Sequence, residues 1–282
     1  MSESKRKGVS VHLGLNSVDP DHYRGWDGAL QGCENDARDM TAIAKAGGFD
    51  TTTLMTKDVT AEAATAAIAA AAKKVGPGDL FVLTYSGHGS QVPDKNSDEP
   101  DKLDETWVLY NRQLVDDELF DLWSKFQPGV RILVLSDSCH SGSAVRTTID
   151  ALKPEVLEGA MTVPPPNGMR TMPKAVAEEV YEANQKIYDD VQARTTAGDK
   201  CVIGANVLLL SGCQDNQTSA DGAKNGLFTQ TLLEVWNDGG FKGGHKKFWK
   251  DIVEHMPPWQ SPNWFTVGPD APAFHRRKPF TI

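Results

Sequence analysis

The sequence has none of the features that direct a protein to a membrane, an export pathway or a nucleic acid. No apolar run approaches the length that crosses a bilayer, and no apolar segment follows the charged residues near the start of the chain. Basic residues are in the minority, with 29 Lys and Arg against 38 Asp and Glu and a net charge of −9. Such a surface repels phosphates and anionic lipids. We therefore expect a cytoplasmic protein with no nucleic-acid or membrane partner.

Cysteine is scarce, with four residues in a chain of 282. They are Cys33, Cys139, Cys201 and Cys213, and no two of them form a Cys-x-x-Cys pair. This spacing suits neither a zinc site nor a disulfide framework. We expect reduced thiols, which is the state that a catalytic thiol requires.

What the sequence does contain is a regular alternation of apolar strands and amphipathic helices. Strands are expected at residues 9–15, 51–56, 80–84, 130–135, 207–210 and 264–267. Helices are expected at residues 36–46, 60–75, 117–126, 228–236 and 246–256. This order predicts a three-layer α/β/α fold with a mostly parallel central sheet of about six strands. A chain of this length can bury a large core between those layers.

Two stretches break the alternation. Residues 90–105 are polar and are predicted to form a loop before a short strand at 106–110. The Pro-Pro-Pro-Asn-Gly run at 164–168 excludes regular structure, and Pro173 is expected to open an amphipathic helix. We interpret residues 146–200 as a flexible insert with one helix. It would separate two parts of one domain, residues 1–145 and 201–282.

Two Gly-containing loops each follow a buried strand. Residues 85–89 read Tyr-Ser-Gly-His-Gly, and residues 137–142 read Asp-Ser-Cys-His-Ser-Gly. Because a parallel sheet binds its ligand beyond the carboxyl ends of its strands, His88 and Cys139 should face each other across a cleft. A thiol and an imidazole that manages its proton are the minimum for cysteine nucleophilic catalysis. The main-chain N–H groups of Gly89 and Cys139 are then the expected oxyanion donors.

These loops and two further segments, residues 32–40 and 210–221, resemble the metacaspases and their bacterial relatives, the orthocaspases. The resemblance covers roughly residues 8–145 and 201–282. It implies a caspase-like fold and a cysteine endopeptidase in which Cys139 is the nucleophile and His88 its partner. It also places Asp36 in the pocket for the substrate residue before the scissile bond, with Cys33 and Ser86 beside it.

The acids of this pocket indicate a basic substrate residue. Asp137 lies two residues before Cys139, on the same side of an extended strand end. Two carboxylates in one pocket favour a cation, so we expect cleavage after Arg or Lys, with Arg slightly preferred for its bidentate geometry. A pocket for Asp would need basic residues, and neither loop offers one. For Asp36 alone, a helix cap is an equally good interpretation.

The acidic residues between positions 101 and 118 form a candidate calcium site, because hard cations need several oxygen ligands. The resemblance to metacaspases implies that Asp104, Asp116 and Asp117 would be the ligands. The family's further carboxylate after the nucleophile is not evident here. Solvated acids and a helix cap explain these residues nearly as well. No organic cofactor is expected.

The insert contains basic residues that are expected to be exposed, where a peptidase specific for basic residues would find its own cleavage sites. Arg194, at the end of the predicted helix, is the first candidate, followed by Arg170 and Arg146. We expect a monomeric zymogen that is activated by such a cut, by Ca²⁺, or by both. Its partners would be protein or peptide substrates with basic residues, and an upstream protease if the cut is not its own.

Three other functions stay open on the sequence. A catalytically inactive caspase-like interaction module would keep the fold without turnover, although the intact Cys–His pair argues against it. Another hydrolase on the same sheet, such as a transpeptidase or an asparaginyl-type peptidase, would need a small uncharged pocket. A transition-metal protein would use Cys139, His140 and His88, but their spacing gives it no support.

Overall fold

A six-stranded sheet forms the centre of the protein, as the alternation predicts. The computed structural model describes residues 6–95, 102–138, 168–196, 200–213 and 219–282. The sheet consists of β1 (Gly8–Gly14), β2 (Asp50–Met55), β3 (Leu80–Ser86), β7 (Arg131–Asp137), β8 (Asn206–Ser211) and β9 (Asn263–Val267), in the order β2-β1-β3-β7-β8-β9. All neighbours are parallel except β8 and β9. The order runs outward from β1 and β3 in both directions, so the strand order reverses at the middle of the sheet.

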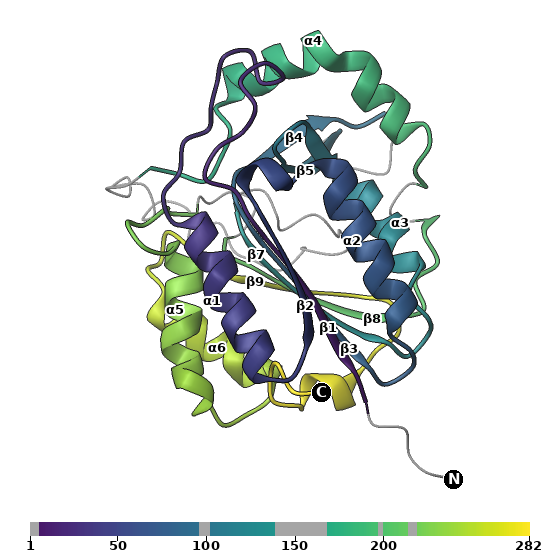
Figure 1. Ribbon diagram of the computed structural model, residues 1–282, viewed down its shortest axis with the longest axis vertical. Helices are drawn as coiled ribbons and strands as arrows, with labels where there is room; N and C mark the ends of the chain where they lie inside the picture. Colours follow the sequence, from purple (N-terminus) through teal and green to yellow (C-terminus); the bar gives the residue numbers. More distant parts are fainter. Residues whose placement is uncertain (1–5, 96–101, 139–167, 197–199, 214–218) are drawn as a thin grey trace.

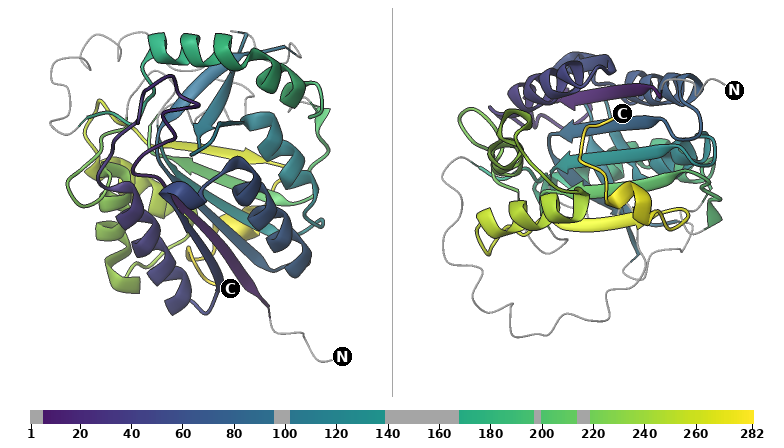
Figure 2. Two further views of the ribbon diagram at one scale, coloured as in Figure 1. Left: turned by 45° about the horizontal axis from the view of Figure 1, so that its top comes forward. Right: turned by 90° about the horizontal axis from the view of Figure 1, so that it is seen from below.

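Helices cover both faces of this sheet (Figures 1 and 2). One face carries α1 (Cys33–Ala46), α5 (Leu227–Trp236) and α6 (His245–His255), and the other carries α2 (Ala61–Lys74) and α3 (Asp116–Ser124). Helices are needed on both faces because each central strand points apolar side chains to both sides of the sheet, as β3 shows. Phe81 and Leu83 are buried in the core under α2 and α3, whereas Leu80 and Val82 are buried in the core under α1 and α5. A short helix, α7 (Pro272–His275), follows β9, and the described residues include 3₁₀ turns at Thr56–Asp58 and Asn237–Gly239.

A second, smaller sheet lies beside the carboxyl ends of the central strands. It is an antiparallel set of β4 (Gly89–Pro93), β5 (Leu103–Val108) and β6 (Gln113–Val115). The prediction of a loop at 90–105 was therefore wrong at both ends, because β4 begins directly after His88 and β5 begins at Leu103. The segment is polar, and its ladder with β5 is what makes it a strand. Residues 96–101 lie outside the described part of the chain.

The helix predicted after Pro173 is present as α4 (Lys174–Gln192). It lies across the top of the molecule in Figure 1, next to the loop between β1 and α1. Val180, Tyr188 and Val191 are buried in a third core there, together with Tyr23 and Val92. The described part of the insert is therefore packed against the domain. Strands β7 and β8, on either side of the insert, pair directly from Arg131↔Asn206 to Ser136↔Ser211. No helix in the described ranges has the length and apolar character to cross a bilayer.

Candidate active site

His88 lies at the carboxyl end of β3, and its orientation is set by a backbone group. The ring is buried, and Nε2 lies 3.0 Å from the carbonyl oxygen of Gly28. Because that oxygen can only accept, Nε2 carries the proton, and Nδ1 is left as the basic nitrogen. Trp26 packs on the imidazole with ring centroids 4.8 Å apart. Gly28 has a φ of 55°, and a Cβ there would lie 3.2 Å from the His88 ring, so glycine suits both the turn and the close approach.

Burial keeps the His88 imidazole neutral. It lowers the pKa of His88 to about 4. The hydrogen bond to Gly28, the carboxylate of Asp221 and the backbone of Thr171 act in the opposite direction, while the Arg170 cation lowers the pKa further. A neutral imidazole with a basic Nδ1 can take a proton from a thiol, which is the role that the sequence predicts for this residue.

Cys139 lies outside the described residues, as do His140 and Arg146. The description of this loop ends at Ser138, one residue beyond β7. Strands β3 and β7 are neighbours in register, and their last pair is Ser86↔Asp137. The described chain therefore reaches Ser138 at the same edge of the sheet as His88, and the predicted position of Cys139 stays a prediction.

The predicted pocket residues gather around a guanidinium group, and the guanidinium belongs to the chain itself. Arg170 has 0 % of its surface exposed. Its Nη2 lies 2.8 Å from Asp36 Oδ2, its Nη1 lies 3.0 Å from Asp137 Oδ2, and Nη1 also donates to Ser86 Oγ at 2.7 Å. The expectation that Arg170 is exposed is wrong. The expectation that Asp36, Asp137 and Ser86 share one pocket that suits a basic side chain agrees with this geometry.

A third acid, Asp221, completes the pocket, and it was not among the predicted pocket residues. Its Oδ1 accepts hydrogen bonds from Arg170 Nη2 at 2.9 Å and from Arg170 Nε at 3.3 Å. Asp221 is held in turn by the main-chain N–H groups of Gln31 and Gly32, at the start of α1. It is the last residue of the 210–221 segment that resembles metacaspases, which was the one available signal.

The other two acids are fixed by donors from α5 and the turn before it. Asp137 Oδ2 accepts from the main-chain N–H and the hydroxyl of Thr229, at 3.0 and 2.8 Å. Asp36 Oδ1 accepts from the side-chain amide of Asn225 and the N–H of Gly226, at 2.9 and 3.1 Å. These contacts join the first part of the chain to the last, so the pocket requires both. A cavity of about 10 Å³ lies at its base, with room for one water at most.

Burial and charge oppose each other in this pocket. Burial raises the pKa of Asp36 to about 6, although the neighbouring Arg170 acts to lower it. Burial also acts to lower the pKa of Arg170, but the charges of Asp137, Asp36 and Asp221 outweigh it and raise that pKa above its usual value. Cys33, predicted to line the pocket, is buried in the first turn of α1, and burial raises the pKa of its thiol. Three acids thus surround one cation in this pocket.

The backbone bends at Arg170 and forms an isolated bridge on each side, between Met169 and Ala220 and between Thr171 and Gly89. Arg170 N–H donates to Ser219 O at 2.9 Å, and Asp221 N–H donates to Gly168 O at 3.2 Å. Gly89 N–H, the predicted oxyanion donor, donates to the carbonyl oxygen of Arg170 at 3.0 Å. Beyond that carbonyl, Met172 N–H donates to Gly89 O at 2.9 Å. The segment is therefore held by its main chain on both sides of the Arg170–Thr171 bond, close to His88.

Arg194, by contrast, lies exposed just beyond the end of α4, where its Nε donates to Asp190 O at 2.8 Å. It is distant in sequence from residues 168–172, and Arg170 is the insert residue that the acid pocket holds. The ranking of these two residues as cleavage sites depends on this contrast.

The predicted calcium ligands are buried acids at the end of the small sheet. Asp104, Asp116 and Asp117 are each at most 5 % exposed. The β5–β6 register ends at Thr106↔Val115, which brings the start of β5 beside the start of α3. Oxygen donors of this kind suit Ca²⁺. Within the described ranges, however, no group of three or more His, Cys, Asp or Glu side chains is arranged to hold a metal ion.

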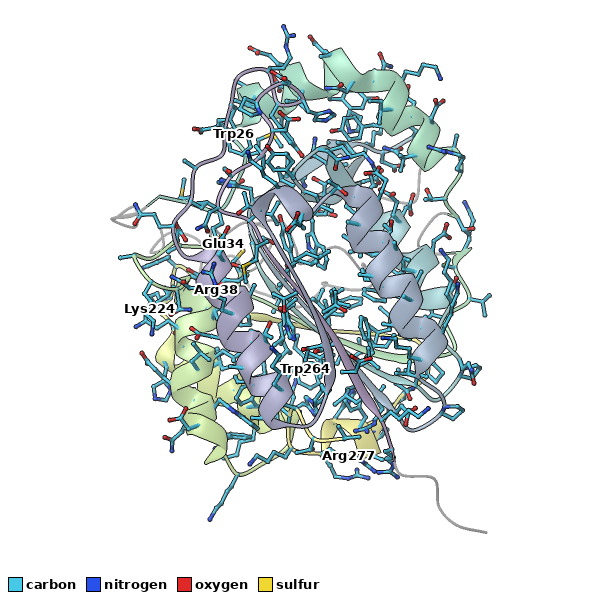
Figure 3. The ribbon with its side chains drawn as sticks, viewed as in Figure 1. Trp26, Glu34, Arg38, Lys224, Trp264 and Arg277 are labelled. Atoms are coloured by element: carbon cyan, nitrogen blue, oxygen red, sulfur yellow. The ribbon has the colours of Figure 1, made fainter. Side chains whose placement is uncertain are left out.

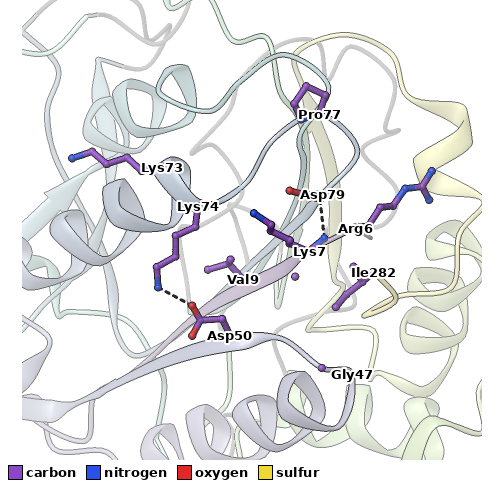
Figure 4. A pocket seen from close by; sticks show the side chains of 12 residues that line it. Arg6, Lys7, Val9, Gly47, Asp50, Lys73, Lys74, Pro77, Asp79 and Ile282 are labelled. Carbon is purple, nitrogen blue, oxygen red and sulfur yellow. Dashed lines mark hydrogen bonds and ion pairs between the residues drawn. The ribbon is translucent and has the colours of Figure 1, made fainter. Parts of the chain in front are cut away.

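A wide surface depression of about 1,310 Å³ lies at the opposite end of the sheet (Figure 4). It is bordered by the amino ends of the strands and by charges of both signs, among them Lys7, Asp50, Lys74 and Asp79. Lys74 pairs with Asp50 at 2.7 Å, and the N–H of Lys7 donates to Asp79 at 2.8 Å. The depression is separate from His88 and the acid pocket.

Comparison with known proteins gives consistent matches over most of the chain. The family model described as the caspase domain of peptidase family C14 matches residues 18–256. Metacaspase-1 of Mycosarcoma maydis is 32 % identical over 257 residues, covering 80 % of this chain and 60 % of that protein. Metacaspase-1A of Aspergillus oryzae is 32 % identical over 250 residues, covering 75 % and 56 %. The chain thus spans about 60 % of the length of these curated relatives.

Two solved structures extend the comparison. A crystal structure of a Geobacter sulfurreducens protein is 50 % identical, covers 98 % of this chain and 99 % of that one, and superposes with a TM-score of 0.85. Caspase-1 of Spodoptera frugiperda is 11 % identical, with coverage of 94 % and 87 % and a TM-score of 0.52. The second likeness concerns the fold alone.

Proposed function

The chain belongs to the caspase-domain family of cysteine peptidases, as its resemblance to metacaspases predicted, and on that premise we propose that it is a cysteine endopeptidase that cleaves after Arg, and less well after Lys. The observation that carries the proposal is the way in which the Arg170 side chain is bound. A basic side chain fills a pocket of three acids, while its own carbonyl oxygen accepts from the N–H of Gly89, the residue after His88. A substrate bound in this way presents one peptide bond to the catalytic groups.

In this mechanism the Cys139 thiol gives its proton to His88 Nδ1, and the sulfur attacks the carbonyl carbon of the basic residue. Charge that develops on the carbonyl oxygen is stabilised by the N–H groups of Gly89 and Cys139. The imidazolium then protonates the leaving amine, and a thioester remains. Water, deprotonated by the same imidazole, hydrolyses the thioester and restores the thiol. Gly28 keeps the proton of Nε2 in place throughout, so that Nδ1 is the nitrogen that exchanges protons.

The same geometry supports self-processing after Arg170. In the intact chain, residues 168–172 occupy the position of a substrate, so the protein is both blocked and positioned to cut itself. We therefore rank Arg170 above Arg194, and Arg146 stays a further candidate. Because β7 and β8 pair directly, the two pieces should stay together after the cut.

Calcium activation is the less supported part of the proposal. Asp104, Asp116 and Asp117 would supply the oxygen ligands, and a bound Ca²⁺ would neutralise buried negative charge where β5 meets α3. Strand β4, which follows His88, pairs with β5.

The test uses the purified full chain, the variants Cys139→Ala and His88→Ala, and peptides that differ only in an Arg, Lys or Asp before the bond to be cut. We expect the Arg peptide to be cleaved best, the Asp peptide not at all, and neither variant to cleave. Intact mass should show a cut after Arg170 in the parent chain only. Preferential cleavage after Asp would contradict the pocket assignment. A folded parent chain that cleaves nothing would support the inactive interaction module instead.

A further inference from the structure

We infer that α4 is a working part of the active site: through Tyr188 it positions the loop that orients His88, and it has to stay bound after the chain is cut. This rests on the proposed function, because it concerns the efficiency of the same catalytic pair. The loop in question comprises residues 16–31, between β1 and α1, and contains no helix or strand of its own. It is the loop that supplies both the Gly28 carbonyl and the Trp26 ring to His88.

Helix α4 contacts this loop at His22 through two hydrogen bonds. The Tyr188 hydroxyl lies 2.8 Å from His22 Nε2, and the side-chain amide of Asn184 donates to His22 O at 3.3 Å. Asn184 has a φ of −120°, outside the helical range, and its amide also donates to Val180 O at 2.9 Å. The irregularity of α4 therefore coincides with its contact to the loop.

From His22 a series of ring contacts leads to the catalytic imidazole. The ring of His22 lies against Tyr23 (centroids 4.9 Å apart), Tyr23 against Trp26 (6.0 Å), and Trp26 against His88 (4.8 Å). Tyr23 is fully buried, and its hydroxyl donates to Leu109 O at 2.7 Å, which fixes the middle of the series. Figure 3 shows Trp26 at the upper end of the molecule, below α4.

The loop also closes on itself, so that a shift at His22 is passed to Gly28. Trp26 N–H donates to Tyr23 O at 3.0 Å, and Val18 N–H donates to Asp27 O at 2.8 Å. Two of the acids that hold the substrate side chain belong to other elements: Asp36 to α1, and Asp137 to the end of β7. The third, Asp221, contacts the loop at its far end, through Gln31 N–H. Loosening α4 at His22 should therefore affect the chemical step more than binding of the basic side chain. Helix α4 begins at Lys174, four residues after Arg170, and its buried Val180 and Tyr188 would keep it in place after the cut.

Two conservative substitutions on the same helix form a matched pair. Tyr188→Phe removes the hydroxyl that lies 2.8 Å from His22 Nε2 and that also accepts weakly from Gln113 N–H, at 3.4 Å. Tyr181→Phe removes a hydroxyl that donates to Asp189 at 2.7 Å and does not connect to the loop, and its ring keeps its contact with Tyr188. Tyr188→Leu removes both ring and hydroxyl. Rates are measured on an Arg peptide under identical conditions for every variant. Each rate is divided by the fraction of that preparation cut after Arg170, as determined by intact mass.

We expect kcat to fall about fivefold in Tyr188→Phe, the equivalent of one net hydrogen bond, and further in Tyr188→Leu. The KM should change less than about twofold, and Tyr181→Phe should match the parent chain. The second readout is the pH dependence of Cys139 alkylation, followed by mass spectrometry of the Cys139 peptide. It should shift in Tyr188→Leu toward the profile of His88→Ala, in which the thiol has lost its partner.

Equal kcat in all three variants and the parent chain would overturn the inference. An effect on KM alone would also overturn it. So would a fall in kcat that appears in Tyr181→Phe as well and parallels the loss of melting temperature. An unchanged alkylation profile in Tyr188→Leu with lowered kcat would also overturn it, because the effect would then not pass through His88. Failure of the proposed function looks different, since the parent chain itself would not cleave the peptide.

Discussion

Asp221 offers a quantitative test of how the acid pocket distinguishes Arg from Lys. Its Oδ1 accepts from both Nε and Nη2 of the buried Arg170, whereas Asp36 and Asp137 contact only the terminal nitrogens. A Lys side chain has no donor at the depth of Nε. The substitution Asp221→Asn keeps the size of the side chain but removes the charge. Gln31 N–H donates to Oδ2 and Gly32 N–H to Oδ1, so the single amide oxygen of Asn can accept from one of them and the NH2 group replaces the other acceptor.

The expected magnitude follows from two separable losses. Removing one partner of a buried charged contact costs about 2–5 kcal/mol, so kcat/KM for an Arg peptide should fall about 30-fold or more. Part of this free-energy loss is the charge attraction to Asp221, which an Arg and a Lys substrate lose alike. The hydrogen bonds to Nε and Nη2 concern Arg alone, and bonds to charged groups contribute about 1.5–3 kcal/mol each. The ratio of kcat/KM for Arg over Lys should therefore fall about tenfold or more.

The assay compares two peptides that differ only in Arg or Lys before the scissile bond. Asp39→Asn is the matched control, because Asp39 accepts the Asn225 amide beside Asp36 but is not one of the three acids on the guanidinium. It should leave the ratio unchanged. Thermal melting checks that the start of α1 stays folded, and intact mass gives the cut fraction. An unchanged Arg-to-Lys ratio in Asp221→Asn would refute the reasoning, whatever the loss in absolute rate.

Further predictions follow from other described groups. Arg170→Gln should leave the chain uncut, whereas Arg194→Gln should be processed like the parent, as intact mass will show; the reverse result would restore Arg194 as the main site. Binding of benzamidine should weaken as pH falls below about 6, since Asp36, whose pKa burial raises to about 6, then loses its charge; inhibition constants between pH 5 and 8 measure this, and a constant value would contradict it. The pKa of His12 is lowered to about 3 by burial, so the folded protein excludes a proton that the unfolded chain binds near pH 6.5. The free energy of unfolding in urea should thus fall as pH drops from about 6.5 toward 3, by up to about 1.4 kcal/mol per pH unit for this group, and the slope should be smaller in His12→Gln. Millimolar Ca²⁺ should raise peptidase activity in the parent chain and not in Asp117→Asn, and equal activity with a chelator would count against a calcium site.

The sequence alone determined the layers of the fold and several members of the site. Alternating residues located β1, whereas short continuous apolar runs located β3, β7 and β8, because strands covered on both faces are buried on both sides. Parallel strands end at one edge of a sheet, so a His after β3 and acids near two strand ends could be expected to meet there. Asp36, Ser86 and Asp137 do meet.

Only the tertiary structure decided what occupies the pocket and what orients the histidine. Arg170 is far from Asp36, Ser86 and Asp137 along the chain, and a lone Arg in a polar insert has the pattern of an exposed residue; its burial depends on three charges that arrive from other elements. The group that fixes His88 is the carbonyl of Gly28, and a backbone carbonyl is present at every residue, so no side-chain pattern could single it out. Strand β4 likewise exists because β5 pairs with it. Local side-chain patterns encode elements, whereas contacts between distant backbone groups and buried charges are fixed only when those elements pack.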